Sequence, residues 1–364
     1  MSGHRIVILG AGYAGLSAAK RFARTAREAE ITVVDARAEF VERVRLHQQA
    51  AGQPIASWDL RELLERKRIR FVQARATEID TERKQVLLDD APALGYDTLV
   101  YALGSTGGTG AVPGVAEYAY SVATPEDVRR LPASLGTGPV AVIGSGATGI
   151  ELAAELAEAQ PDTRVVLLGA EEPAAWLAPK ASAHVRRVLE RLGVEIRGGV
   201  KVVEVTGDGV WLADGELVAA AATVWTAGFD VPDLAARTGL AVDGGGRVLT
   251  DASLRSVSHP DVYAAGDCAV IAGPGGRELR MACATALPTG MYAAEVISAR
   301  IQGREPRPMK FRYLVQCLSL GRDDGLIQVL HADDSPAKTV LTGRSAAWLK
   351  ERVVRFAAAG AGLS

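Results

Sequence analysis

The segment RIVILGAGYAGLSAAKRFAR, residues 5–24, decides the fold of this chain. It opens with an unbroken apolar run, residues 6–9, which is typical of a strand buried in a parallel sheet. Gly10, Gly12 and Gly15 follow with the spacing G-x-G-x-x-G. This spacing allows a tight turn, a close approach of backbone to a pyrophosphate, and close packing of the next helix on the strand. The segment therefore predicts a dinucleotide-binding fold, with phosphates at the helix N-terminus.

An acidic residue completes this pattern. A second apolar run, residues 31–34, ends in Asp35, about 20 residues after the third glycine, where a carboxylate can accept both hydrogens of a ribose diol. A glycine pattern alone is a weak signal. Together with the strand before it, the helix after it and the distal acid, it is a strong one.

The same pattern occurs a second time. In PVAVIGSGATGIELAAELAE, residues 139–158, Gly144, Gly146 and Gly149 repeat the spacing of the first three glycines. A strand leads in, a helix leads out, and another apolar run, residues 165–168, follows. Two complete fingerprints in one chain predict two dinucleotide sites.

The second fingerprint lacks the distal acid. Gly169 stands at the corresponding strand end and is followed by Ala170, Glu171 and Glu172. The usual mark of NADH is therefore missing, but two acids without an arginine would repel the 2′-phosphate of NADPH. Glu171 is a candidate substitute for the missing carboxylate, so the sequence favours NADH and leaves NADPH open.

Composition excludes several classes of protein. The chain has 364 residues and a formal net charge of −2, so nothing in it indicates a nucleic-acid partner. Its three cysteines, Cys268, Cys283 and Cys317, are far apart, which argues against a disulfide framework and against a C-x-x-C metal or redox site. We expect no metal, no signal peptide and no membrane-spanning segment, and hence a cytoplasmic protein.

Further segments run a buried strand into a turn of small residues. They are TLVYALGS (98–105), TVWTAGF (223–229) and DVYAAGDCA (261–269). Residues 104–114 are the expected linker between the two folds, because they are rich in glycine. Thr124 is expected to cap a short helix over residues 125–131, and long helices are expected over 285–301 and 345–356.

In this order, the two fingerprints and the motifs LVYALGS, VWTAGF and VYAAGD resemble the pyridine nucleotide–disulfide oxidoreductase superfamily, from Arg5 to about Ile301. The resemblance implies an α/β fold with two Rossmann-like domains and a small C-terminal α+β segment. The implied FAD domain is discontinuous, with the NAD(P)H domain inserted into it. The expected boundaries are 1–122 with 248–304 for FAD, 123–247 for NAD(P)H, and 305–364 for a C-terminal cap.

The resemblance also assigns residues to the two cofactors. Asp35 would bind the adenosine ribose, and Asp267 the ribityl chain or pyrophosphate of FAD. Glu151 would lie near the nicotinamide and is a candidate catalytic residue. The expected cofactor-binding set is Gly10, Gly12, Tyr13, Ala14, Gly15, Asp35, Arg43, Ala76, Gly104, Gly144, Gly146, Gly149, Gly228, Gly266, Asp267, Thr285 and Ala286.

His47 is the second candidate catalytic residue. The ordinary pKa of histidine suits a proton source for the second substrate. A lone histidine is more often structural, and this alternative stays open. Cys283 is most simply a small packing residue.

The missing cysteines narrow the resemblance. Disulfide reductases of this superfamily carry a redox cysteine pair either in the helix after the first acid or in the second domain, and neither region contains cysteine here. The chain then resembles the type II NADH:quinone oxidoreductases and the ferroptosis-suppressor or AMID-type quinone reductases. These enzymes pass a hydride from NAD(P)H through FAD to a quinone. Residues 281–297 take the place where such enzymes form the flavin–quinone pocket.

The helix AAWLKERVVRF, residues 346–356, interleaves apolar and cationic residues. Such a helix can lie on an anionic membrane surface and collect a quinone, or its apolar stripe can pack on the protein or on a second copy in a homodimer. The stripe is short, which favours packing over a peripheral membrane location.

Two other functions stay open at this stage. One is a reductase for another acceptor, either a ferredoxin or rubredoxin docking on a basic patch around Arg43 and Arg45 or a pathway-specific soluble substrate. The other is a redox-sensing flavoprotein without turnover.

Overall fold

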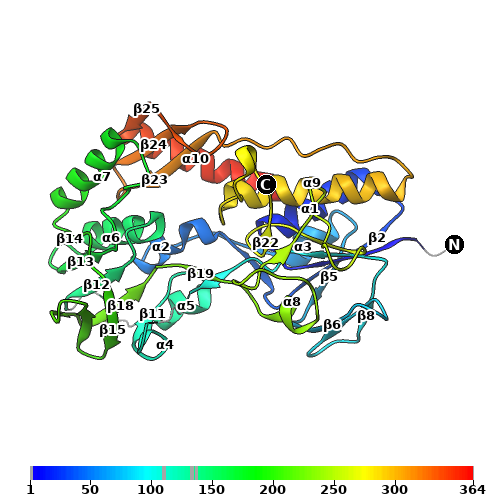
Figure 1. Ribbon diagram of the computed structural model, residues 1–364, viewed down its shortest axis with the longest axis horizontal. Helices are drawn as coiled ribbons and strands as arrows, with labels where there is room; N and C mark the ends of the chain where they lie inside the picture. Colours follow the sequence, from blue (N-terminus) through cyan, green and yellow to red (C-terminus); the bar gives the residue numbers. More distant parts are fainter. Residues whose placement is uncertain (1–2, 109–111, 132–134, 136–137, 364) are drawn as a thin grey trace.

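The computed structural model describes residues 3–108, 112–131, 135 and 138–363 of the chain. Two five-stranded parallel sheets with helices on their faces lie side by side, and a smaller C-terminal unit lies across both (Figure 1). The predicted α/β architecture of two Rossmann-like units with a small α+β segment is thereby confirmed.

The first sheet has the strand order β21-β9-β1-β2-β5, and every pair is parallel. Its strands are β1 (Arg5–Leu9), β2 (Glu30–Asp35), β5 (Arg70–Gln73), β9 (Thr98–Tyr101) and β21 (Val262–Ala264). The first fold is discontinuous, because β21 follows all strands of the second sheet in the sequence. The apolar run of β1 is fully buried, as expected for a strand with both faces covered.

The second sheet has the order β11-β18-β12-β13-β14 and is also parallel throughout. Its strands are β11 (Ala119–Tyr120), β12 (Val140–Ile143), β13 (Val165–Leu168), β14 (Glu195–Arg197) and β18 (Ala222–Trp225). Its main helices are α6 (Ala147–Ala159) and α7 (Pro179–Arg191). The short helix α5 (Pro125–Arg130) begins at the predicted cap, where Thr124 and Asp127 form a capping box.

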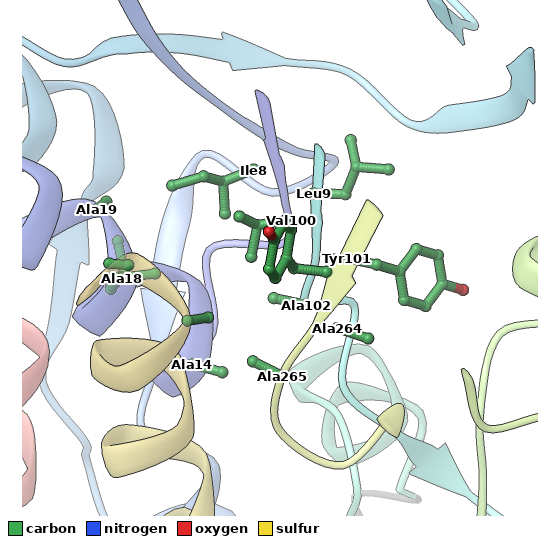
Figure 2. Packing of buried hydrophobic residues seen from close by; sticks show 14 of the residues in the cluster. Ile8, Leu9, Ala14, Ala18, Ala19, Val100, Tyr101, Ala102, Ala264 and Ala265 are labelled. Carbon is green, nitrogen blue, oxygen red and sulfur yellow. The ribbon is translucent and has the colours of Figure 1, made fainter. Parts of the chain in front are cut away.

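Two helices pack closely on the first sheet. They are α1 (Tyr13–Thr25) and α9 (Cys283–Ile301), and their contact is formed by small residues. A Cβ atom added to Gly290 of α9 would lie 2.1 Å from the carbonyl oxygen of Ala14, so only glycine fits there. Figure 2 shows the alanines of α1, among them Ala14 and Ala18, beside the larger side chains of the sheet. This close packing fixes the start of α9 next to the first glycine turn.

Short elements lie between the strands of each sheet or link the two folds. Those before the second fingerprint are β3 (Glu39–Val41), η1 (Arg43–Arg45), α2 (Leu46–Ala50), β4 (Ser57–Asp59), α3 (Leu60–Glu65), β6 (Ala76–Asp80), β7 (Gln85–Leu88), β8 (Leu94–Gly95), β10 (Thr106–Gly107) and α4 (Val115–Tyr118). Those after it are β15 (Val202–Thr206), β16 (Gly209–Leu212), β17 (Leu217–Ala219), β19 (Phe229–Asp230), α8 (Leu234–Arg237), β20 (Val248–Leu249), β22 (Ala269–Val270) and η2 (Pro274–Gly276). Of the expected linker 104–114, residues 109–111 lie outside the described part.

The C-terminal unit, which we call the tail, is an antiparallel sheet followed by one helix. It consists of β23 (Val315–Ser319), β24 (Gly325–Leu330), β25 (Pro336–Thr342) and α10 (Arg344–Ala361). In Figure 1 the tail sheet lies over the second fold, and α10 runs from there towards α1 and α9 of the first. The domain boundaries at 122 and 248 stay predictions, and β11 and β20 are the strands nearest to them.

The apolar stripe of α10 does not pack on this chain at its largest residues, because the side chains of Trp348 and Phe356 are 63% and 80% exposed. The alternative that the stripe packs on a second copy stays a prediction. The face of α10 that packs on the protein is made mostly of small residues, namely Ala346, Lys350, Val354, Ala357, Ala358 and Ala361. The sequence pattern identified an amphipathic helix but not which face is covered.

Candidate active site

A cavity of about 1580 Å³ lies between the two folds and the tail. Drug-sized ligands occupy pockets of roughly 300–1000 Å³, so this cavity has room for more than one such ligand. Its wall includes both glycine turns, the start of α9, and residues of β23 and α10. The two predicted nucleotide sites therefore open into one space.

The first glycine turn has the geometry of a phosphate cradle. A Cβ atom on Gly12 would meet no heavy atom within 4 Å, so the backbone there faces open space. A Cβ atom on Gly15 would lie 1.8 Å from the carbonyl oxygen of Gly10, so the helix packs on the turn as closely as glycine allows. The free N–H groups at the start of α1 point at this space.

The second glycine turn repeats this geometry. Gly146 is open on the side where its Cβ would be, and a Cβ on Gly149 would lie 1.8 Å from the carbonyl oxygen of Gly144. Each turn can therefore hold the pyrophosphate of one dinucleotide.

The strand ends beside the two turns differ. Asp35 accepts hydrogen bonds from the backbone N–H of Ala11 (2.7 Å) and of Arg37 (2.9 Å), which fixes its carboxylate at the first turn. In the second fold, a Cβ on Gly169 would lie 2.2 Å from Oγ of Ser145. The Ser145 hydroxyl lies beside Gly169 and donates a hydrogen bond to the carbonyl oxygen of Glu171 (2.9 Å). The serine thus occupies the space that an acid at position 169 would need.

A polar network lies beside the first turn. Arg43 donates through Nη1 to the carbonyl oxygen (2.6 Å) and Oγ (2.9 Å) of Ser105, and Ser105 Oγ donates to Asp267 Oδ2 (2.7 Å). The other guanidinium nitrogen, Nη2 of Arg43, and Oδ1 of Asp267 are buried without a hydrogen-bond partner. Buried polar groups are normally paired. A donor and an acceptor left unpaired in this cavity fit the phosphates and hydroxyls of FAD.

A second polar cluster lies where the second fold meets the tail. Lys350 donates through Nζ to Glu151 Oε1 and to Ser319 Oγ (2.6 Å), and the backbone N–H of Ser319 donates to Glu151 Oε1 (2.9 Å). Burial raises the pKa of Glu151, but the charges of Lys350 and His47 and these hydrogen bonds outweigh it and lower that pKa. Glu151 is therefore an ionised carboxylate paired with a buried ammonium.

His47 lies beside this cluster. Its Nδ1 is 3.8 Å from Glu151 Oε2, and its Nε2 is buried without a hydrogen-bond partner. Burial lowers the pKa of His47 to about 4, so its imidazole is neutral near pH 7. A neutral imidazole carries no extra proton that it could give to a substrate. This disfavours the expected role of His47 as a proton source.

Two adjacent residues of α10 bind to different folds. Lys350 pairs with Glu151 of α6, whereas Glu351 accepts two hydrogen bonds from Arg45 of η1, at 2.9 and 2.8 Å. Arg45 also pairs with Glu42 at 3.1 Å. One turn of α10 therefore joins the first fold to the second at the cavity.

Two cysteines line the same end of the cavity. They are Cys283 at the start of α9 and Cys317 on β23. Burial raises the pKa of both thiols, that of Cys317 to about 12, so neither is a ready thiolate nucleophile. Within the described residues no group of His, Cys, Asp and Glu side chains forms a candidate metal site.

Most of the expected site residues line the cavity. These are Gly10, Gly12, Tyr13, Ala14, Asp35, Arg43, His47, Ala76, Gly104, Gly144, Gly146, Glu151, Gly228, Gly266, Asp267 and Ala286. Gly15 and Gly149 lie behind the turns that they allow. Thr285 is not part of the wall; its hydroxyl points back to the carbonyl oxygens of Arg280 (2.6 Å) and Ala282 (2.7 Å), just before the start of α9.

The sequence analysis missed Ser105, Ser319 and the buried role of Lys350. Ser105 ends the motif LVYALGS, so its position after a buried strand was a usable signal. Lys350 and Ser319 reach Glu151 only through the packing of the tail, and no local pattern marks them.

Two dinucleotide folds that open into one cavity define a class of protein, the oxidoreductases that use FAD and NAD(P)H. A family model described as pyridine nucleotide-disulphide oxidoreductase matches residues 4–290. The chain belongs to this family.

Individual relatives cover nearly the whole chain. An NADH dehydrogenase-like protein of Mycobacterium tuberculosis (strain ATCC 25618 / H37Rv) is 30% identical over an alignment of 368 positions, gaps included, which covers 92% of this chain and 91% of the relative. The demethylphylloquinone reductase NdbB of Synechocystis sp. is 28% identical over an alignment of 353 positions, which covers 90% of this chain and 87% of the relative.

A solved structure supports the fold. NDH2 from Plasmodium falciparum in complex with NADH superposes with a TM-score of 0.85 at 15% identity, and the match covers 99% of this chain and 96% of that one. No helix among the residues that the structure describes is long and apolar enough to cross a membrane.

Proposed function

We propose that this protein transfers two electrons from NADH, through bound FAD, to a quinone. The observation that carries the proposal is the buried pair of Lys350 and Glu151 at the tail end of the cavity. Apolar side chains of Leu314, Val353 and Val354 line the cavity around it. An apolar wall with one ammonium group fits a ring that must be bound and then protonated. The curated relatives named as quinone reductases support the same acceptor.

The proton count explains the need for this pair. When bound, FAD accepts a hydride and passes two electrons on. NADH supplies one hydride, whereas a quinone must gain two electrons and two protons to become a quinol, so one proton per turnover comes from water. Lys350 presents N–H groups at Nζ, held in place by Ser319 and Glu151. Lys350 would donate a proton to a quinone oxygen. The Glu151 carboxylate would then take up a proton that comes from water and pass it to Nζ.

The second fold favours NADH. The side chains of Glu171 and Glu172 are exposed at the cavity wall, and Glu172 pairs with Arg186. This pairing neutralises the nearby arginine that could otherwise bind a 2′-phosphate. Both carboxylates would repel NADPH.

Access for a lipid-soluble quinone is proposed at the exposed face of α10. Leu314 and Val353 line the cavity and are also exposed, at 61% and 38%. Trp348 and Phe356 stand on the same helix, beside the exposed cations Arg352 and Arg355. An apolar face flanked by cations suits the surface of an anionic membrane. We therefore propose peripheral membrane binding through α10.

The geometry disfavours the alternative of a docking iron–sulfur protein. The expected basic patch around Arg43 and Arg45 is not free, because Arg43 is bound to Ser105 and Arg45 is bound to Glu42 and Glu351. Turnover with a quinone should therefore depend little on ionic strength, whereas electrostatic docking of a protein would weaken with salt.

The test separates the two half-reactions by stopped flow under anaerobic conditions. NADH should bleach the flavin absorbance of the holoenzyme, and a soluble quinone should restore it. Lys350→Met should leave the reduction by NADH unchanged and slow the reoxidation by quinone roughly 100-fold, the usual size of a proton-transfer contribution. Lys338→Met, an exposed lysine of β25, is the matched control.

Liposomes give the second arm of this test. Anionic vesicles should bind the wild-type protein and speed reoxidation by a long-chain quinone, and Trp348→Ser with Phe356→Ser should abolish both effects. A holoenzyme that quinone does not reoxidise would contradict the proposed acceptor. Dimerisation through α10 without vesicle binding would contradict the membrane proposal alone.

A further inference from the structure

Helix α6 carries three acids on one face, at the spacing i, i+4 and i+7. They are Glu151, Glu155 and Glu158, and side chains at this spacing are neighbours on a helix surface. Glu151 lines the cavity, Glu155 is fully buried, and Glu158 is half-buried near the end of the helix. The row therefore connects the cavity with the protein surface.

All three acids face the same segment of the tail. Glu151 accepts a hydrogen bond from the backbone N–H of Ser319. Two turns further on, Glu158 Oε2 accepts one from the backbone N–H of Arg322, at 2.7 Å. Between them, Glu155 Oε1 lies 3.6 Å from Nη1 of Arg322. The segment from β23 to Arg322 covers the row and excludes bulk solvent from its middle member.

Glu155 is unusual because its carboxyl group is buried inside the protein. Its side chain is 0% exposed; Oε2 accepts a hydrogen bond from Nε2 of Gln53 (2.6 Å), and Oε1 has no hydrogen-bond partner. A buried carboxylate with an oxygen that accepts no hydrogen bond is costly in its ionised form. Burial raises the pKa of Glu155, and the neighbouring Gln53, Arg322 and Lys350 only partly offset this, while Glu158 adds to it. The Glu155 carboxyl is suited to hold a proton.

The distance to the next acid allows a proton to pass. Residues four apart on a helix have Cβ atoms about 5–6 Å apart, a gap that a carboxyl rotation or one water molecule spans. His47, with Nδ1 3.8 Å from Glu151 Oε2, is another buried residue with a polar atom that makes no hydrogen bond. Gln53, which binds Glu155, follows α2, the helix that carries His47.

We infer that Glu155 conducts protons from the surface near Glu158 and Arg322 to Glu151, and so replaces the proton that the acceptor takes from Lys350. The inference rests on the proposed function. In each cycle one O–H bond forms and one breaks at Glu155, and at Glu151 after it. The new N–H bond at Lys350 completes the transfer. One proton from water thus joins the hydride of NADH to balance the quinol, and no further reactant is needed.

The competing explanation is that Glu155 only anchors the tail. A carboxylate next to Arg322 would do this without exchanging a proton. The two explanations differ in which half-reaction they affect. A relay serves only the step that consumes a proton, whereas a loosened tail would disturb the cavity for both steps.

Glu155→Gln tests the relay, because the amide keeps the size of the side chain and can still accept from Gln53. In the relay, reduction of the holoenzyme by NADH stays unchanged, and reoxidation by quinone slows roughly 10- to 100-fold. The reoxidation also becomes slower with rising pH, and its solvent deuterium isotope effect increases. Glu155→Asp, which keeps a carboxyl, should retain part of the rate.

Asp324→Asn is the matched control. Asp324 is another buried carboxylate of the tail, bound to His184 (2.9 Å) and Arg191 (2.9 Å) but outside the cavity wall. This variant tests whether loosening the tail is enough to slow reoxidation. We expect Asp324→Asn to be reoxidised at the wild-type rate. Infrared spectra of the apoprotein in H₂O and D₂O give a readout independent of turnover. The band of a protonated carboxyl should persist to a higher pH in wild type than in Glu155→Gln, because burial raises the pKa of Glu155.

Several outcomes would overturn the relay. These are a wild-type reoxidation rate and pH profile in Glu155→Gln, equal slowing of both half-reactions, and the same slowing in Asp324→Asn. The relay is supported if quinone reoxidises the Glu155→Gln variant slowly and the wild-type protein fast. A wild-type holoenzyme that quinone fails to reoxidise at all contradicts the proposed function, and the relay with it.

Discussion

The two nucleotide folds have nearly the same glycine turn but different surroundings. In both, the third glycine packs against the carbonyl of the first, with the same distance of 1.8 Å to the absent Cβ. Beside the first turn stand Asp35 and the half-buried pair of Arg43 and Asp267, each with one buried polar atom that has no hydrogen-bond partner. Beside the second stand Ser145 and the exposed acids Glu171 and Glu172.

This difference matches the two tasks of the folds. A cofactor that stays bound gains from buried groups that only it can satisfy, because leaving them unpaired is costly. A coenzyme that leaves in each cycle gains from exposed groups, which cost little when it is absent. We therefore propose that the resident FAD binds to the first fold and the exchanging NADH to the second.

The largest effect is expected from the third glycines. Gly15→Ala and Gly149→Ala each force a methyl group onto a backbone oxygen, which cannot move away like a side chain, so each should cost at least 1–3 kcal/mol of stability. Gly15→Ala should yield protein without flavin, whereas Gly149→Ala should keep flavin but lose reduction by NADH. Flavin absorbance and urea unfolding measure this. Gly244→Ala, with nothing within 4 Å, is the control.

The outcome that would break the comparison is loss of flavin in Gly149→Ala. The second turn would then hold the resident cofactor, and the two assignments would have to be exchanged.

The next effect concerns the carboxylate of the first fold. Asp35→Ala should weaken FAD binding roughly 10- to 100-fold, since a hydrogen bond to a charged group contributes about 1.5–3 kcal/mol. Asp35→Asn should weaken FAD binding less than Asp35→Ala. Equilibrium dialysis of the apoprotein with FAD measures the change. Normal flavin occupancy in Asp35→Ala would count against the ribose contact.

The burial of His47 between the two folds can be tested by the pH dependence of stability. The unfolded chain binds a proton at His47 below about pH 6.5, but the folded protein does so only below about pH 4, because burial lowers the pKa. The free energy of unfolding should therefore fall as the pH falls from 6.5 towards 4. His47→Gln should remove about 1–2 kcal/mol of this fall between pH 7 and 5. Parallel curves for variant and wild type in urea titrations would show that His47 is not buried between the folds.

The smallest effect is expected at the coenzyme end of the second fold. Glu172→Gln frees Arg186 from one carboxylate and should lower the KM for NADPH about 3- to 10-fold, the effect of roughly 1 kcal/mol for one partly exposed charge. The KM for NADH should change little. Glu190→Gln removes the other partner of Arg186, at 3.1 Å and outside the cavity wall, and is the matched control. An equal effect of both variants would contradict a direct role of Glu172.

Local patterns were enough to predict the two folds. Buried runs such as residues 6–9 and 140–143, and the glycines after them, depend only on neighbours in sequence. Their strands were predicted correctly, as were the cap at Thr124 and the long helix over α9. The helix α10 was also expected, but its length was underestimated because the segment after Phe356 is rich in small residues.

The acceptor end of the cavity could not be predicted in this way. Lys350 and Glu151 are 199 residues apart in sequence, and only the packing of the tail brings them together. The same holds for Glu155, which looks like an ordinary helix residue until Arg322 and Gln53 are seen around it. In α10, Lys350 is one of several cations in an amphipathic pattern, and only tertiary packing distinguishes it from the others by burying it.

The joining of both folds by neighbouring residues of α10 has a consequence for how the enzyme is made. Both nucleotide folds leave the ribosome before α10 does, so a growing chain can form its two glycine turns while Glu151 still lacks Lys350. Such a chain could take up cofactors but not protonate an acceptor. The reaction with quinone would therefore become available only once α10 has brought Lys350 to Glu151, whereas reduction by NADH would not depend on this step.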